Sequence, residues 1–162
     1  MASVPFPNLP YLLDATGNKH VALVQTRAIL RHIGRKYHLL GDDIDTFDVL
    51  LDECSDFDDV LTGLSYGNFD SAKSVFEEEL RPKLQQFTAH LERAGPFLNG
   101  KDPCVADFKF FDTLSKLKVA EQEAGTHIVA SSPAIMEYVS RVENLPAIAA
   151  YLASSAFLDR PL

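Results

Sequence analysis

Residues 4–34 read VPFPNLPYLLDATGNKHVALVQTRAILRHIG, and this stretch decides the fold. Three prolines fall within six residues, directly before the apolar run Tyr11–Asp14. Proline has no N–H to donate to a β-ladder, so we expect the first strand to begin after Pro10. A turn cluster at 15–18 and the β-branched run His20–Val24 follow, and together these segments predict a β-hairpin. Leu9-Pro10 is an X–Pro bond, where a cis peptide is cheap and usually marks a tight turn.

Helical patterns follow the hairpin to the end of the chain. Thr26 is predicted to cap a helix with an apolar stripe that ends near Tyr37. Beyond Gly41 the strand signal disappears. Further helices are predicted over 45–66, over 75–91 with a kink at Pro82, over 105–119, and from Pro133 and Pro146. The predicted fold is α+β and mostly α, with a hairpin and helix in residues 1–40 and an all-helical domain in residues 45–162.

The bulk composition excludes several classes of function. The chain has 162 residues, a net charge of −8 and a pI near 5.0, which argues against nucleic-acid binding and against attachment to an anionic membrane. No apolar run reaches the roughly 18 residues of a membrane span. Neither the cysteines (Cys54 and Cys104) nor the five histidines show the spacing of metal ligands, so no metal site is predicted. We expect a soluble, cytoplasmic, globular protein.

Four blocks of sequence carry a family resemblance. They are FPNLPYLLD, VQTRAILRHIGRKYHLLG, PFLNGKDPCVADFKFFD and SSAFLDRPL, in this order between Phe6 and Leu162. Together they resemble the cytosolic glutathione S-transferases, most closely class mu with some sigma character. The resemblance implies a truncated thioredoxin-like domain, here a β-hairpin plus helix, followed by the all-helical C-terminal domain of that family. It also implies a homodimer.

The resemblance assigns a glutathione site to two segments. In the family, the Asn-Leu-Pro turn carries a cis-proline, and its backbone pairs with the cysteinyl part of glutathione like an added strand. Asn8, Leu9 and Pro10 match this turn. The family's Gln-Ser pair, which holds the γ-glutamyl carboxylate at a helix N-terminus, is Gln25-Thr26 here. The next residue, usually Asn, is Arg27.

Three further residues match the family pattern. Asp56 corresponds to an aspartate that reaches across the dimer to the ligand's amino group, and Tyr66 to a tyrosine of the electrophile site. Asp56 lies among other acidic residues, and the alternative is that they form only a solvated face. Asp107 resembles a buried helix cap with a structural role, but Cys104 replaces its usual Ser or Thr partner.

The thiol-activating tyrosine of the family belongs to a βαβ unit ahead of the Asn-Leu-Pro turn, and such a unit needs roughly 30 residues. Only Met1–Pro5 precede the matching segment, so the catalytic group is expected to be absent and the isolated chain to have little or no conjugating activity. Loss of that unit would leave a strand edge open, so we expect a homodimer partner or another chain to cover it. Three functions stay open: a transferase homologue that needs groups from elsewhere, a non-catalytic interaction or structural subunit, and a glutathione binder without chemistry.

Overall fold

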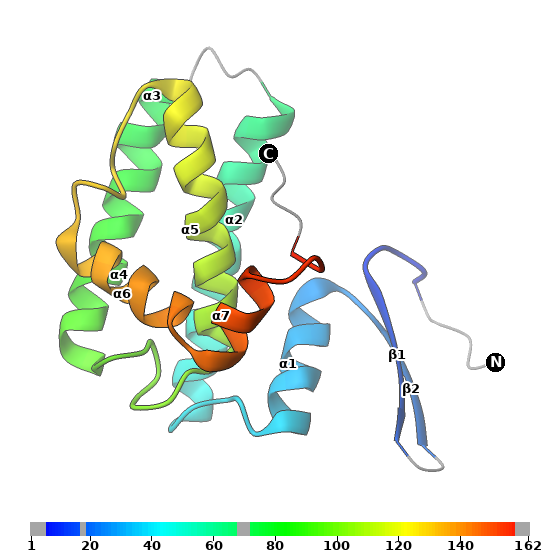
Figure 1. Cartoon of the computed structure of the whole chain (residues 1–162). Coiled ribbons are helices and arrows are strands. Elements are labelled where there is room, and N and C mark those ends of the chain that lie inside the picture. The colour runs from blue at the N-terminus through cyan, green and yellow to red at the C-terminus, as the bar shows by residue number, and fades with distance from the viewer. Residues whose placement is uncertain (1–5, 17–18, 68–71, 158–162) are drawn as a thin grey trace.

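The structure is a computed structural model that describes residues 6–16, 19–67 and 72–157 (Figure 1). A β-hairpin and one helix stand beside a larger helical bundle, so the fold is mostly α, as predicted. The elements in chain order are β1 (Tyr11–Thr16), β2 (Lys19–Val24), α1 (Thr26–Tyr37), α2 (Ile44–Tyr66), α3 (Ala72–Val75), a π-helical turn (Phe76–Leu80), α4 (Arg81–Ala94), α5 (Val105–Ala124), α6 (Pro133–Glu143) and α7 (Pro146–Leu152).

The hairpin is antiparallel, with Tyr11 opposite Val24 and Leu13 opposite Ala22. Both predicted strands are present and slightly longer than expected. The predicted turn residues Gly17-Asn18 lie outside the described residues. Figure 1 shows α1 between the hairpin and the bundle. The hairpin is therefore attached to the rest of the molecule through α1.

The start of α1 differs from the prediction. Thr26 is the first helical residue and not the cap, because the chain already turns at Gln25, which has φ +72° and ψ 115°. Gln25 makes no side-chain capping hydrogen bond, and its carbonyl accepts the N–H of Ile29 at 3.0 Å. A positive φ is unfavourable for a residue with a Cβ. The junction between β2 and α1 is therefore strained at the position assigned to ligand binding.

The segment around Pro82 is one continuous helical run, as predicted, but it contains a π-helical turn. α3, the π-helical turn and α4 follow one another without a break, and Val75, Leu80 and Arg81 at their junctions have α-helical φ and ψ. Pro82 lies directly after the π-helical turn, inside this run, where it has no N–H to donate to the preceding turn. The next helix, α5, extends to Ala124, beyond the predicted end at Val119.

The core lies inside the helical bundle. Phe87 stacks on Phe110 with ring centroids 4.1 Å apart, and Phe57 and Tyr138 contact the same cluster. These four rings come from α2, α4, α5 and α6, so they join the main helices of the bundle. Over the described ranges, none of the helices combines the length and apolar character needed to cross a bilayer.

Candidate functional site

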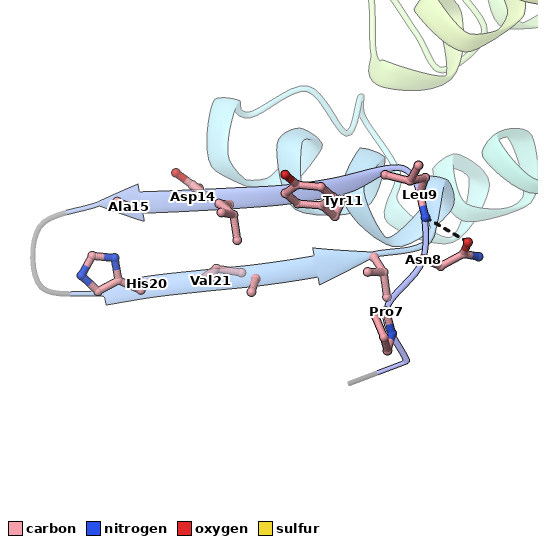
Figure 2. Close-up of a pocket in the computed structure, with 11 residues that line it drawn as sticks. Pro7, Asn8, Leu9, Tyr11, Asp14, Ala15, His20 and Val21 are labelled. Carbon is pink, nitrogen blue, oxygen red and sulfur yellow. Dashed lines mark hydrogen bonds between the residues drawn. The ribbon is translucent and has the colours of Figure 1, made fainter. Parts of the chain in front are cut away.

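The two halves of the predicted glutathione site lie at the same end of the hairpin, and each borders a different hollow. Because Tyr11 pairs with Val24, the residues just before Tyr11 and just after Val24 lie at the same end of the sheet. Asn8, Leu9 and Pro10 are all exposed, and the Leu9-Pro10 peptide is cis. The N–H of Leu9 donates to Asn8 Oδ1 at 2.9 Å (Figure 2). The register of the hairpin therefore brings 8–10 close to Gln25-Thr26.

A hollow of 1020 Å³ follows the open face of the hairpin (Figure 2). Its lining residues are mostly apolar: Pro7, Asn8, Leu9, Tyr11, Leu13, Asp14, Ala15, His20, Val21, Ala22 and Val24. Tyr11 lines this hollow, and 59 % of it is exposed. The reason is strand alternation: Tyr11 and Leu13 lie on the face that α1 does not cover.

A second hollow, of 600 Å³, opens at the start of α1. Its lining residues are largely polar or charged: Gln25, Thr26, Arg27, Ala28, Arg31, Ser55, Asp58, Asp59 and Lys109. Thr26 and Gln25 therefore border a charged hollow between α1, α2 and α5. The first turn of α1 contains no acidic residue that would occupy its free N–H groups.

Asp56 is close to this site but is bound within its own chain. Arg27 Nη2 lies 2.8 Å from Asp56 Oδ1 and 3.2 Å from Asp59 Oδ2. One helical turn further along α1, Arg31 pairs in the same way with Asp48 at 2.6 Å and Asp52 at 2.9 Å.

The acidic face is solvated, since the side chains of Asp56 and Asp59 are 60% and 74% exposed, and its carboxylates also pair with two arginines. Sequence reasoning missed this ladder of ion pairs. Its signal was present, since the arginines are four residues apart and the aspartates recur along one face of a helix.

Asp58 holds a second charged cluster that sequence reasoning missed. Its carboxylate accepts hydrogen bonds from Lys109 Nζ at 2.6 Å, Lys116 Nζ at 3.0 Å and Thr113 Oγ1 at 3.4 Å. Only 11 % of the Lys109 side chain and 15 % of that of Asp58 are exposed. Burial alone would raise the pKa of Asp58, but the two lysines outweigh it and the pKa is lowered. This cluster joins α2 to α5 at the base of the charged hollow.

A third cluster fixes β1 on α1. Asp14 accepts hydrogen bonds from Lys36 Nζ at 2.5 Å and His32 Nε2 at 2.7 Å. The hydrogen bond from Lys36, followed by that from His32, lowers the pKa of Asp14. The strand that follows the cis-proline is therefore tied to the helix that begins at Thr26.

Two of the predicted residues lie away from this site. Tyr66 ends α2, is 90 % exposed and lines neither hollow. It is ten residues, or about 15 Å of helix, from Asp56. Asp107 is buried at the start of α5 and accepts the N–H groups of Cys104 at 2.8 Å and Leu98 at 2.9 Å.

The arrangement suits binding of an extended, anionic peptide. The exposed turn at 8–10 offers backbone for strand-like pairing, and the start of α1 offers N–H groups and a cation to a carboxylate. Both cysteines are buried, and burial raises the pKa of each thiol, so neither is a nucleophile. Over 6–16, 19–67 and 72–157, no three His, Cys, Asp or Glu side chains are grouped to hold a metal ion.

Comparison with known proteins gives a consistent result. The sequence profile of a family described as "Glutathione S-transferase, C-terminal domain" matches residues 55–155. Glutathione S-transferase B of Cavia porcellus is 33% identical over 161 residues, which are 97% of this chain and 70% of that protein. Glutathione S-transferase Mu 1 of Bos taurus is 32% identical over the same shares.

Solved structures show the same fold. The crystal structure of the glutathione S-transferase Blo t 8 superposes with a TM-score of 0.80 at 22% identity, covering 94% of this chain and 71% of that one. The Pi-class glutathione S-transferase of Onchocerca volvulus gives a TM-score of 0.70 at 23% identity, covering 83% of this chain and 65% of that one.

Proposed function

Because the chain belongs to the glutathione S-transferase family, we propose that it binds glutathione where residues 8–10 and 25–26 meet. The observation that carries the proposal is the register of the hairpin, which puts the exposed turn at 8–10 beside the start of α1. The ligand's cysteinyl backbone pairs with Leu9, and its γ-glutamyl carboxylate binds at Gln25-Thr26. Binding exchanges the bond between the Leu9 N–H and Asn8 Oδ1 for one to the ligand.

We also propose that these 162 residues bind glutathione without ionising its thiol efficiently. An activating hydroxyl has to donate a hydrogen bond to the sulfur. Of the other tyrosines in the described segments, Tyr37 is at the far end of α1 from Thr26, and those of the helical bundle lie in α2, α6 and α7: Tyr66, Tyr138 and Tyr151. Tyr11 borders the hollow next to Leu9, but it follows the cis-proline on the strand itself.

Glutathione-agarose retention combined with a chlorodinitrobenzene assay tests both statements. We expect the chain to be retained on the resin and to be eluted by free glutathione. We expect its turnover to stay close to the uncatalysed rate. Ordinary transferase turnover by the pure chain refutes the second statement, and failure to bind the resin or glutathione in solution refutes the first. Tyr11→Phe, which keeps the ring, shows whether any residual turnover comes from that hydroxyl.

The second candidate is an interaction subunit of a larger assembly, and the open face of the hairpin favours it. Tyr11 and Leu13 are exposed over a hollow of 1020 Å³, and among the described residues the outer edges of both strands have no further strand paired to them. In this candidate role, a second copy of the chain or a partner chain covers the open face of the hairpin. A further apolar groove, of 460 Å³, lies between α2 and α4 and includes Val49, Leu50 and Phe87.

The oligomeric state tests this candidate. Sedimentation of the wild type is expected to show association that Leu13→Lys weakens, because the new charge lies on the open face. Thr62→Lys, on the exposed side of α2, adds the same charge elsewhere and is the control. A monomeric wild type that captures no partner contradicts the interaction role.

A further inference from the structure

The outer edge of β1 lacks the features that usually protect the edge of a sheet. β2 pairs with one side of β1 from Tyr11 to Thr16, and no other strand of the described ranges pairs with its other side. Natural edge strands are commonly protected by lysine, by proline or by a β-bulge. β1 contains neither lysine nor proline, and its uninterrupted register with β2 contains no bulge. This edge can therefore accept an added strand.

Of the two strands, β1 presents more apolar surface. Tyr11 is 59 % and Leu13 67 % exposed, and Leu9, just before the strand, is 78 % exposed. On β2, by contrast, the residues from Val21 to Val24 are all half-buried. Association along β1 would therefore remove more apolar surface from water than association along β2.

The charge distribution favours a second copy of the chain at this edge. The net charge is −8, so two copies repel each other on average. Within residues 6–15 the one charged residue is Asp14, and Lys36 Nζ lies 2.5 Å from its carboxylate. The edge of β1 is thus a neutral, apolar part of an acidic molecule, where two copies can meet with little repulsion. A basic partner would instead be attracted to the exposed carboxylates of α2, such as Asp56.

The position of Asp14 favours one register between two such strands. A closed pair of identical edge strands is antiparallel, with a two-fold axis at its centre. Because side chains alternate, the odd-numbered residues Tyr11 and Leu13 must face odd-numbered residues of the other copy. With the axis at Leu12, Tyr11 lies opposite Leu13 of the second copy, and the two Asp14 residues are four positions apart along the strands, roughly 14 Å. With the axis at Leu13, they are only two positions apart, roughly 7 Å, which is within the screening length of about 10 Å at 0.1 M salt. Repulsion thus favours the register centred on Leu12.

We propose that β1 pairs with β1 of a second copy in antiparallel orientation, with Leu12 on the two-fold axis, to form a continuous four-stranded sheet. The inference rests on the proposed interaction role and identifies the partner as a second copy of this chain. An isolated two-stranded hairpin is marginally stable, whereas three or more strands support a stable sheet. Tyr11 contacts Leu13 of the other copy on the open face, where cross-strand pairs that include an aromatic side chain stabilise a sheet.

Disulfide formation between introduced cysteines tests the register. Leu12→Cys puts two thiols opposite each other at the axis, at a Cα separation of roughly 5 Å that a disulfide can span. Leu23→Cys is the matched control, because Leu23 pairs with Leu12 inside the hairpin and is half-buried on the same face. Its two copies would be three strand spacings apart, roughly 14 Å. Oxidised dithiothreitol, which is reduced as the thiols join, is added to the full 162-residue chain, and non-reducing electrophoresis separates the products.

Leu12→Cys is expected to form the disulfide-linked dimer at least about tenfold faster than Leu23→Cys, and urea at unfolding concentrations should abolish the difference. The native thiols of Cys54 and Cys104 are buried and do not react in the folded protein. If circular dichroism shows that Leu12→Cys is unfolded, an equimolar mixture of Tyr11→Cys and Leu13→Cys, both at exposed positions, replaces it. This mixture should give a mixed dimer faster than either variant alone, because the two positions lie opposite each other.

Sedimentation of the wild type separates the two ways in which the inference can fail. A dimeric wild type without preferential cross-linking at Leu12, or between positions 11 and 13, overturns the inference but leaves the interaction role in place, because the two copies then meet elsewhere. A wild type that is monomeric at the concentration of the cross-linking experiment also overturns it. Capture of another protein by that monomer would assign the edge of β1 to a different chain.

Discussion

The hydroxyl of Tyr138 donates a hydrogen bond of 2.9 Å to the carboxylate of Asp107, and both residues are buried. The same carboxylate accepts the N–H groups of Leu98 and Cys104, so one side chain joins α5, α6 and the loop before α5. Burial raises the pKa of Asp107 and is opposed by these hydrogen bonds. Asp107 is thus central to the stability of the helical bundle.

Asp107→Ala should lower the free energy of unfolding by about 3–5 kcal/mol, because it leaves several buried donors without an acceptor. Tyr138→Phe removes only one hydrogen bond and should cost about 1–2 kcal/mol. Urea denaturation followed by circular dichroism measures both. Glu137→Ala, at an exposed position, is the control and should change the value by less than about 0.5 kcal/mol. A loss for Asp107→Ala as small as that of the control would contradict the role assigned to Asp107.

Asp58→Asn should destabilise the protein by about 2 kcal/mol at pH 7, since Lys109 and Lys116 both lose an ion pair in a partly buried site and keep only Asp112 as a carboxylate partner. The folded-state pKa of Asp58 lies below its ordinary value of 3.8, so its contribution is present above that value. It is lost as the pH falls through the lower folded-state pKa. The wild type and the variant should therefore differ less at pH 3 than at pH 7.

Denaturant titrations at the two pH values test this, with the exposed Asp102→Asn as the control. A difference between wild type and Asp58→Asn that is the same at pH 3 and pH 7 would refute the ion-pair explanation.

Both thiols of the folded protein should be unreactive at pH 8. Burial raises the pKa of Cys104 to about 12 and that of Cys54 well above its ordinary value. The reactive thiolate is therefore scarce, and the sulfur atoms are inaccessible. Ellman's reagent should detect no thiol in the native protein within minutes and both thiols in denaturant. Rapid modification of the native protein would show that the structure opens around α5.

Gln25→Gly should affect stability and ligand binding in opposite directions. Glycine tolerates the φ of +72° at this position, so the substitution relieves strain in the folded state. Glycine also makes the unfolded chain more flexible, which offsets part of this gain. The net result should be a free energy of unfolding about 0.5 kcal/mol higher. Loss of the amide should weaken glutathione binding. The matched control is Gln85→Gly within α4, which should lower stability by about 1 kcal/mol because its backbone is helical. A loss of stability for Gln25→Gly as large as the control's would contradict the strain at Gln25.

Much of the fold could be predicted from local patterns. Strand alternation and turn residues located the hairpin, and the 3.6-residue period located most of the helices. The error at Thr26 arose because a hydroxyl is a good helix cap, whereas the cap position is set by where β2 ends. The π-helical turn before Pro82 depends on packing in the bundle, which local periodicity does not contain.

The charged parts of the site were harder to predict. Each ion pair that joins α1 or α5 to α2 connects residues that are 17 to 58 positions apart, such as Arg31 with Asp48 and Lys116 with Asp58. Their geometry depends on how α1 and α5 lie against α2, and a single sequence does not fix those placements. The family resemblance indicated Gln25, Thr26 and Asp56 but could not show that Arg27 pairs with Asp56.

The attachment of the hairpin through α1 has a consequence for slow motions. Asp14, His32 and Lys36 tie β1 to α1, and Figure 1 shows α1 between the strands and the helical bundle. Amide protons of β1 and β2 should therefore exchange with deuterium through brief local openings, well before those of the buried centre of α5. A tripeptide bound to both Leu9 and Thr26 would stabilise the contacts between β1 and α1, so its binding would slow deuterium uptake in the strands.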